Sequence, residues 1–199
     1  MRSMTDSRRI TAATGVASAA LALGGILVAT LVSSSFTWTE AALSDMGRPG
    51  TATYWLFNGA LVTAGTLGFP FAYALLADAR NAVQRVGIGL FLVTVAAMAM
   101  VGILHLPKDG HGLAAVTHYF GATLFLWVWG TGEALAGRVR RGLATVWLAN
   151  VHVLAWTLWA GLVAPEWFAA AEYAGALIFG GWVLFTARRL LGNAVRTAA

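Results

Sequence analysis

The sequence predicts an all-α integral membrane protein, a six-transmembrane-helix bundle with both termini cytoplasmic. Three observations carry this prediction: six long apolar stretches, basic residues confined to alternate gaps between them, and a composition unlike that of a soluble domain. Hydrophobic residues make up 59% of the 199-residue chain and charged residues 11%. Soluble domains have roughly 45–50% and 25%.

Each apolar stretch is long enough to cross the hydrocarbon core of a bilayer, which takes about 20 helical residues. The predicted spans lie near residues 11–32, 54–77, 86–105, 112–135, 144–164 and 167–187. Together they form one transmembrane domain over 11–187. A cytoplasmic tail over 1–10 precedes it, and a basic cytoplasmic tail over 188–199 follows it.

The basic residues predict the orientation of these spans. All but two lie before the first span, after the sixth, or in the second and fourth gaps: Arg2, Arg8, Arg9, Arg80, Arg85, Arg138, Arg140, Arg141, Arg188, Arg189 and Arg196. The other gaps hold only Arg48 and Lys108. Basic residues in alternate loops are the positive-inside pattern of membrane proteins. We therefore expect a multi-pass protein of the cell membrane with cytoplasmic N and C termini.

The same pattern limits the partners and cofactors to consider. The net charge of +5 follows from the positive-inside bias, so we expect no nucleic-acid partner. The lipid bilayer is the partner that the sequence indicates, and a membrane protein partner or a homo-oligomer is left open. Because the chain has no cysteine, disulfides, thiolate metal ligands and cysteine nucleophiles are excluded.

Polar side chains inside the spans are the candidate functional groups, because burying them in lipid is costly. With a rise of about 1.5 Å per helical residue, several of them fall at one depth near the outer surface. The loop after the first span adds a serine and an aspartate there. The predicted polar pocket, open to the extracytoplasmic side, consists of Ser44, Asp45, Asn58, His105, His111, His118 and Glu172.

Two contacts are predicted inside this pocket. Asp45 is expected to lie within one water-mediated contact of His111 or His105, and Glu172 is expected to be protonated or paired with His118. A purely structural interpretation stands beside each: Asp45 can cap a short helix, since aspartate accepts free backbone N–H groups well. Three polar residues outside the pocket are interpreted as structural: Glu133 near Arg138, and Asn150 and His152 as hydrogen-bonding groups between helices.

Short motifs in this chain resemble a known family. Ser-Asp-Met-Gly at 44–47 follows the first span, Phe-Asn-Gly at 57–59 opens the second, and Gly65 follows Asn58 by seven residues. Gly-Ile-Leu-His-Leu-Pro at 102–107 ends the third span, with His111 shortly after. Over roughly residues 15–185, this pattern resembles the multi-pass membrane family known as domain of unknown function 998.

The resemblance implies a six-helix bundle and brings no established activity. The residues that match the family pattern are Ser44, Asp45, Gly47, Asn58, Pro107 and His111. His105 and His118 look like additions in this chain, so the resemblance implies no role for them.

Three function classes follow, and the sequence leaves open whether the protein is an enzyme. The first is a binding protein whose pocket holds a lipid headgroup, a small ligand or a partner helix, which needs only convergent polar groups in an apolar cavity. The second is a metal-dependent membrane hydrolase. Zinc accepts histidine and carboxylate ligands, and its site would consist of His105, His111, His118 and Asp45.

The third class is transport or electron transfer. A haem would need two histidines at one depth, and His118 and His152 differ by about 9 Å along the membrane normal. This difference makes haem an unfavourable cofactor. The chain also has no duplicated halves of the kind found in inverted-repeat transporters.

Overall fold

The computed structural model describes the backbone of residues 2–196 and the side chains of residues 6–195. Within that range it contains six long helices and no strand: α1 (Arg2–Val32), α2 (Tyr54–Asp78), α3 (Ala82–Ile103), α4 (His111–Leu135), α5 (Val139–Leu158) and α6 (Phe168–Arg196). Two short helices lie in the connections. These are the 3-10 helix η1 (Leu43–Gly47) and the π-helix η2 (Trp159–Val163), which extends α5.

Each predicted span corresponds to one helix of the described chain, and all six are long and apolar enough to cross a membrane. The ends differ from the predicted ones. α1 and α6 continue into the predicted tails, of which residues 1 and 197–199 lie outside the described residues. α3 begins four residues earlier than predicted, because the Asn81 side chain caps it by accepting the Gln84 N–H at 3.0 Å.

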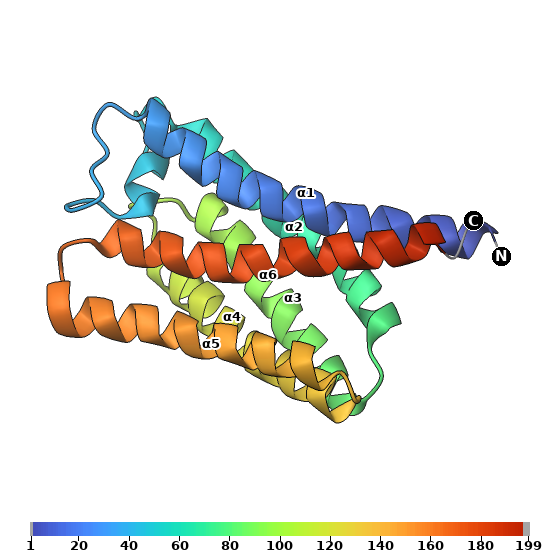
Figure 1. Ribbon diagram of the computed structural model, residues 1–199. Coiled ribbons are helices and arrows are strands. Elements are labelled where there is room, and N and C mark those ends of the chain that lie inside the picture. Colours follow the sequence, from blue (N-terminus) through green and yellow to red (C-terminus); the bar gives the residue numbers. More distant parts are fainter. Residues whose placement is uncertain (1, 197–199) are drawn as a thin grey trace.

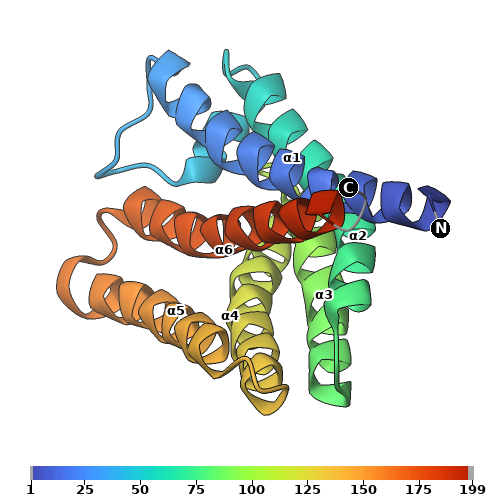
Figure 2. The same cartoon turned by 45° about the vertical axis from the view of Figure 1, so that its right-hand side comes forward.

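The six helices form a ring in sequence order, and α6 packs back on α1 (Figures 1 and 2). One end of the ring carries η1 and the segment between α1 and α2, and we call it the loop end. The opposite end carries both termini and the hairpins around residues 79–81 and 136–138, and we call it the termini end. α5 and α6 share the smallest interface in the ring: they are joined at the loop end and diverge toward the termini end (Figure 1).

Glycines allow the close approach of neighbouring helices. A Cβ atom on Gly65 would lie 2.6 Å from the Val95 carbonyl oxygen, so α2 and α3 pack backbone against backbone. α4 and α5 do the same near the termini end, where a Cβ on Gly142 would lie 2.5 Å from the Gly130 carbonyl oxygen. Small residues at such crossings are typical of membrane helix pairs.

Apolar side chains occupy both the interior and the exterior of the ring. Phe91, Phe125 and Trp182 form part of a buried aromatic cluster in which the Phe125 and Trp182 ring centroids lie 4.8 Å apart. Outside, Trp55 is 81% exposed and Phe120 and many other large apolar side chains also face outward. Soluble proteins rarely expose apolar surface on this scale. The arrangement is that of a multi-pass membrane protein.

Candidate functional site

The segment between α1 and α2, with η1 in it, covers the loop end of the ring; we call residues 33–53 the cap. Its backbone binds the start of α6. Trp167 and Ala169 donate their N–H groups to the carbonyl oxygens of Thr39 (2.8 Å) and Ala41 (3.2 Å). N–H groups at a helix start have no partner within the helix. The cap supplies acceptors for these N–H groups of α6, and the same hydrogen bonds hold the cap in place.

The cap is also bound to α2. The Asn58 side-chain amide donates to the Gly47 carbonyl oxygen at 2.9 Å. Within the cap, the hydroxyl of its last residue, Thr53, donates to the Met46 carbonyl oxygen at 2.8 Å. Asn58 is buried between α2 and η1, and a Cβ on Gly47 would lie only 2.5 Å from its Oδ1 atom. Asn58 therefore holds η1 and does not line the space beneath it.

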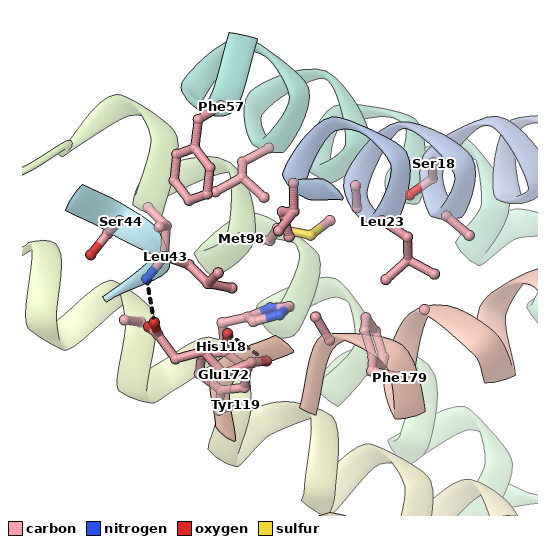
Figure 3. Close-up of a pocket in the computed structure, with 18 of the residues that line it drawn as sticks. Ser18, Leu23, Leu43, Ser44, Phe57, Met98, His118, Tyr119, Glu172 and Phe179 are labelled. Carbon is pink, nitrogen blue, oxygen red and sulfur yellow. Dashed lines mark hydrogen bonds between the residues drawn. The ribbon is translucent and has the colours of Figure 1, made fainter. Parts of the chain in front are cut away.

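A cavity of about 60 Å³ lies beneath η1, enclosed by α1, α2, α3, α4 and α6 (Figure 3). At roughly 10–15 Å³ per water-sized group, it admits a few such groups. Apolar side chains, among them Leu23, Met98 and Phe179, form most of its wall. Its polar lining is Ser18, Ser44, His111, His118, Tyr119 and Glu172.

The Glu172 carboxylate binds the cap across this cavity. Its Oε2 atom accepts the backbone N–H of Leu43 in η1 at 2.7 Å (Figure 3). The backbone carbonyl of Glu172 accepts the Tyr119 hydroxyl at 3.1 Å. Among the described residues, the second carboxylate oxygen has no hydrogen-bond donor. Glu172 is thus partly committed to the cap and retains one acceptor atom for a ligand.

His118 enters the middle of the same cavity from α4 (Figure 3). Its Nδ1 atom lies 3.1 Å from the Thr94 carbonyl oxygen. A carbonyl oxygen only accepts, so Nδ1 carries the proton and the Nε2 atom of the neutral ring is an acceptor. The predicted His118–Glu172 pair is not formed, because each side chain binds a backbone group instead.

Two other donors around the cavity are already used, whereas the Ser44 hydroxyl has no hydrogen bond to any described residue. The Ser18 hydroxyl donates to the Ala64 carbonyl oxygen at 2.7 Å, and the Tyr119 hydroxyl is bound as described above. His111 donates from Nδ1 to the Leu104 carbonyl oxygen at 2.9 Å, which also leaves it an acceptor Nε2 atom. With Glu172 ionised, its free carboxylate oxygen and the Nε2 atoms of the two histidines are acceptors.

The predicted contact of Asp45 with the histidines is wrong. Its carboxylate accepts the Ala42 N–H (2.8 Å) and the Arg48 Nε–H (2.7 Å). The first bond caps η1, and the second is a partly exposed ion pair. Asp45 also does not line the cavity. The alternative interpretation, a helix cap, is the one that applies.

The predicted metal site is also not formed. His105 donates from Nδ1 to the adjacent Leu106 carbonyl oxygen (3.0 Å), and its ring packs edge-on against Tyr54 outside the cavity. Among the described residues, no three histidine, aspartate or glutamate side chains gather closely enough to hold a metal ion. His105, His111, His118 and Asp45 therefore do not form a ligand set, because backbone atoms and Arg48 hold them apart.

Comparison with known families identifies the family to which the chain belongs. The family model described as a protein of unknown function (DUF998) matches residues 16–189. The chain belongs to the DUF998 family. No curated protein and no solved structure matches it.

The residues that carry the DUF998 resemblance build the cap and its supports. Ser44, Asp45 and Gly47 lie in η1, and Asn58 binds the Gly47 carbonyl oxygen from α2. His111 begins α4 and binds back to Leu104 at the end of α3. These matched positions thus stabilise the covering of the cavity, and only Ser44 and His111 also line it.

The predicted helix-joining role of two further residues is confirmed. His152 contacts the Thr123 hydroxyl through Nδ1 (2.7 Å) and accepts the Trp156 indole N–H through Nε2 (3.3 Å). Asn150 accepts the Trp127 indole N–H at 3.0 Å. Both residues therefore connect α5 to α4.

The termini end of this DUF998 protein holds an ionic network that the sequence analysis largely missed. Asp78 at the end of α2 accepts two hydrogen bonds from Arg138 (2.7 and 3.0 Å) and one from Arg189 (3.0 Å). Glu133, on α4, lies 4.0 Å from Arg138, as anticipated, and 3.7 Å from Arg141. The network joins α2, α4, α5 and α6 and contains three arginines for two carboxylates.

A signal for this network is present in the sequence. Asp78 ends one span and Glu133 nearly ends another, on the side where the arginines gather. Carboxylates at the arginine-rich end of apolar spans are well placed to form ion pairs. From the sequence, only the proximity of Glu133 to Arg138 was predicted, and Asp78 was assigned no partner.

Proposed function

We propose that this DUF998 protein binds a small amphipathic ligand whose polar end carries a hydrogen-bond donor, an alcohol or an amine, in the cavity beneath the cap. The observation that carries the proposal is the convergence of two free acceptors, one Glu172 carboxylate oxygen and His118 Nε2, on a mostly apolar cavity. Apolar pockets with a few convergent polar groups are typical ligand sites. A ligand that presents only acceptors would leave these buried atoms unpaired, which is costly.

A lateral groove supports entry of such a ligand from the bilayer. Between α4 and α5, toward the loop end, lies an apolar groove of about 570 Å³. Ala115, Tyr119 and Glu172 line both this groove and the cavity. The hydrocarbon part of a ligand can lie in the groove while its polar end reaches Glu172.

Photoactivatable probes test this proposal directly. A long-chain alcohol, amine and carboxylic acid, each with the same diazirine-bearing chain, are added to the protein in lipid nanodiscs. We expect the alcohol and the amine to label peptides of α4 and α6 at the cavity about tenfold more than the acid, since one hydrogen bond to a charged group contributes about 1.5–3 kcal/mol. Equal labelling by all three probes would contradict the proposal.

Glu172→Gln sharpens the test. The amide oxygen can still accept the Leu43 N–H, which turns the amide NH₂ group toward the cavity and replaces an acceptor with a donor. Labelling by the amine should then fall and labelling by the acid should rise. Glu40→Gln, which changes an exposed carboxylate in the cap, is the matched control and should leave the preference unchanged.

We also propose that the loop end faces the outside of the cell and the termini end the cytoplasm, on the support of the arginine distribution. The absence of native cysteine makes single-cysteine labelling clean. An impermeant thiol reagent added to intact cells should label Ser34→Cys in the cap and spare Arg140→Cys in the first turn of α5. The reverse pattern would invert the proposed orientation.

A further inference from the structure

A second groove opens between α5 and α6 at the termini end. It has a volume of about 350 Å³. Its apolar wall includes Leu148, Leu177, Ile178, Trp182 and Phe185. Glu133, Arg141 and Arg189 lie along it, and all three belong to the ionic network.

The groove has the length of one leaflet. From Leu177 to Arg189, α6 rises about 18 Å at 1.5 Å per residue. Half of a typical hydrocarbon core is about 15 Å. The groove therefore extends from the level of the arginines to about the middle of the bilayer, and its apolar part faces the region that a lipid acyl chain occupies.

At the charged end of the groove, Arg141 and Arg189 have N–H donors that remain free to bind an anion. Arg141 is 37% exposed in its side chain, lies 3.7 Å from Glu133, and forms no side-chain hydrogen bond with any described residue. A guanidinium carries five N–H donors arranged to fit a phosphate. Arg189 uses one nitrogen on Asp78. With three arginines for two carboxylates, the network has a net charge of +1 when all five groups are ionised.

We propose that this groove is a binding site for an anionic phospholipid of the leaflet at the termini end. The phosphate binds Arg141 and Arg189, and one acyl chain lies between α5 and α6. Charge complementarity selects the anionic lipid: the network is positive, and the exposed Arg140 and Arg188 flank it in sequence. Basic pockets between membrane helices on the cytoplasmic side bind such headgroups.

A bound lipid also accounts for the separation of α5 from α6 at the termini end. α5 and α6 diverge where the groove lies and share the smallest interface between neighbours (Figure 1). Trp182 forms part of the groove and donates its indole N–H to Thr145 at 3.2 Å, so the indole donor is already used within the groove. An acyl chain requires no hydrogen bonds and fits a groove of this kind.

The test uses phosphatidylglycerol and phosphatidylcholine that carry the same diazirine-bearing acyl chain, each as a minor component of phosphatidylcholine vesicles containing the full-length protein. We expect phosphatidylglycerol to label peptides 141–148 and 177–189 about fivefold more than phosphatidylcholine, the ratio that about 1 kcal/mol from Arg141, the arginine without a hydrogen bond, gives. Equal labelling by the two lipids would overturn the proposal.

Three variants locate the effect. Arg141→Gln should reduce phosphatidylglycerol labelling to the phosphatidylcholine level, and Arg140→Gln, one residue away and outside the groove, should not. Glu133→Gln should increase labelling, because Arg141 loses its competing carboxylate. Equal effects of Arg140→Gln and Arg141→Gln would mean that surface charge alone attracts the lipid, and the site would be rejected.

One competition experiment separates a lipid from a free anion. Inorganic phosphate at millimolar concentration lacks the acyl chain, so it should leave phosphatidylglycerol labelling almost unchanged. Displacement of the lipid probe by inorganic phosphate would show an anion site without a lipid chain and would overturn the proposal. Circular dichroism of each variant in the same vesicles confirms that the helices are retained.

Discussion

The two ends of the ring hold their polar side chains in different ways. At the loop end, Asp45, Asn58, His118 and Glu172 each bind a backbone group, most often in the cap or next to it. At the termini end, arginines and carboxylates of four helices bind one another. This difference shows that the backbone of a loop can form hydrogen bonds with buried polar side chains, which at the termini end are bound by charged side chains instead. Loss of a charge should therefore destabilise the protein most at the termini end, and loss of a side-chain hydrogen bond to the backbone should do so most at the loop end.

Asp78→Ala should cause the largest loss of stability. It removes the acceptor of three hydrogen bonds and leaves Arg138 and Arg189 close together without a carboxylate between them. We expect a loss of about 3 kcal/mol, the lower range for breaking a buried ion pair. Unfolding in mild detergent, followed by circular dichroism, measures it.

Two related variants show whether charge is responsible. Asp78→Asn retains an acceptor oxygen and should lose less than Asp78→Ala. Asp109→Ala, at an exposed carboxylate of the loop end, should change the unfolding free energy little. If Asp78→Ala and Asp109→Ala have equal effects, the contrast between the two ends does not hold.

Glu172→Ala should destabilise the protein by about 2 kcal/mol, because it leaves the buried Leu43 N–H without an acceptor. Glu172→Gln keeps an acceptor and should cost much less. The same unfolding assay compares them, and a large loss in Glu172→Gln would show that the charge, and not the backbone contact, is what matters there.

A double variant with His118→Ala extends this test. Glu172 and His118 bind different backbone groups, so the two losses should add to within about 0.5 kcal/mol. Strong non-additivity would indicate a direct pair between these side chains.

Gly47→Ala should have a smaller effect of about 1–2 kcal/mol, in the range for overpacking. Its Cβ would lie 2.5 Å from Asn58 Oδ1 and 2.9 Å from the Phe57 ring, which pushes η1 away from α2. Limited proteolysis should show faster cleavage of the cap. Gly59→Ala, whose Cβ would meet no atom within 4 Å, is the matched control, and equal cleavage rates would refute this prediction.

Arg48→Ala should have the smallest effect. The Arg48–Asp45 pair is half-exposed, and pairs of this kind contribute about 0.2–1 kcal/mol. Added salt should reduce even this difference between Arg48→Ala and the unmodified protein. A loss as large as that of Asp78→Ala would mean that the loop end also depends on ion pairs.

Hydrophobic length alone predicted the six helices, because crossing a bilayer imposes a long apolar run on each. Their ends were less predictable. Asn81 begins α3 earlier than the apolar run does, and α1 and α6 continue beyond the apolar residues as far as Arg2 and Arg196. The ends of a helix depend on capping side chains and on contact with water. Neither can be found from the positions of apolar residues.

The candidate site could be predicted only in part. Depth along the membrane normal placed Ser44, His111, His118 and Glu172 near one another, and all four line the cavity. Depth does not give the direction in which a side chain points around its helix, and it ignores loop carbonyls. For this reason Asp45, Asn58 and His105, at similar heights, bind Ala42, Gly47 and Leu106 instead.

The contact between α1 and α6 has a consequence for how the gene can be rearranged. The first and last helices are neighbours, and the start of α1 and the end of α6 lie at the same end of the ring (Figure 1). For this reason the order of the helices in the ring does not depend on where the polypeptide is opened. A circular permutant that links α6 to α1 through a short flexible peptide and opens between α2 and α3 keeps six spans and leaves every basic segment on its original side. The same proximity lets two copies be fused in tandem in one orientation without an added span.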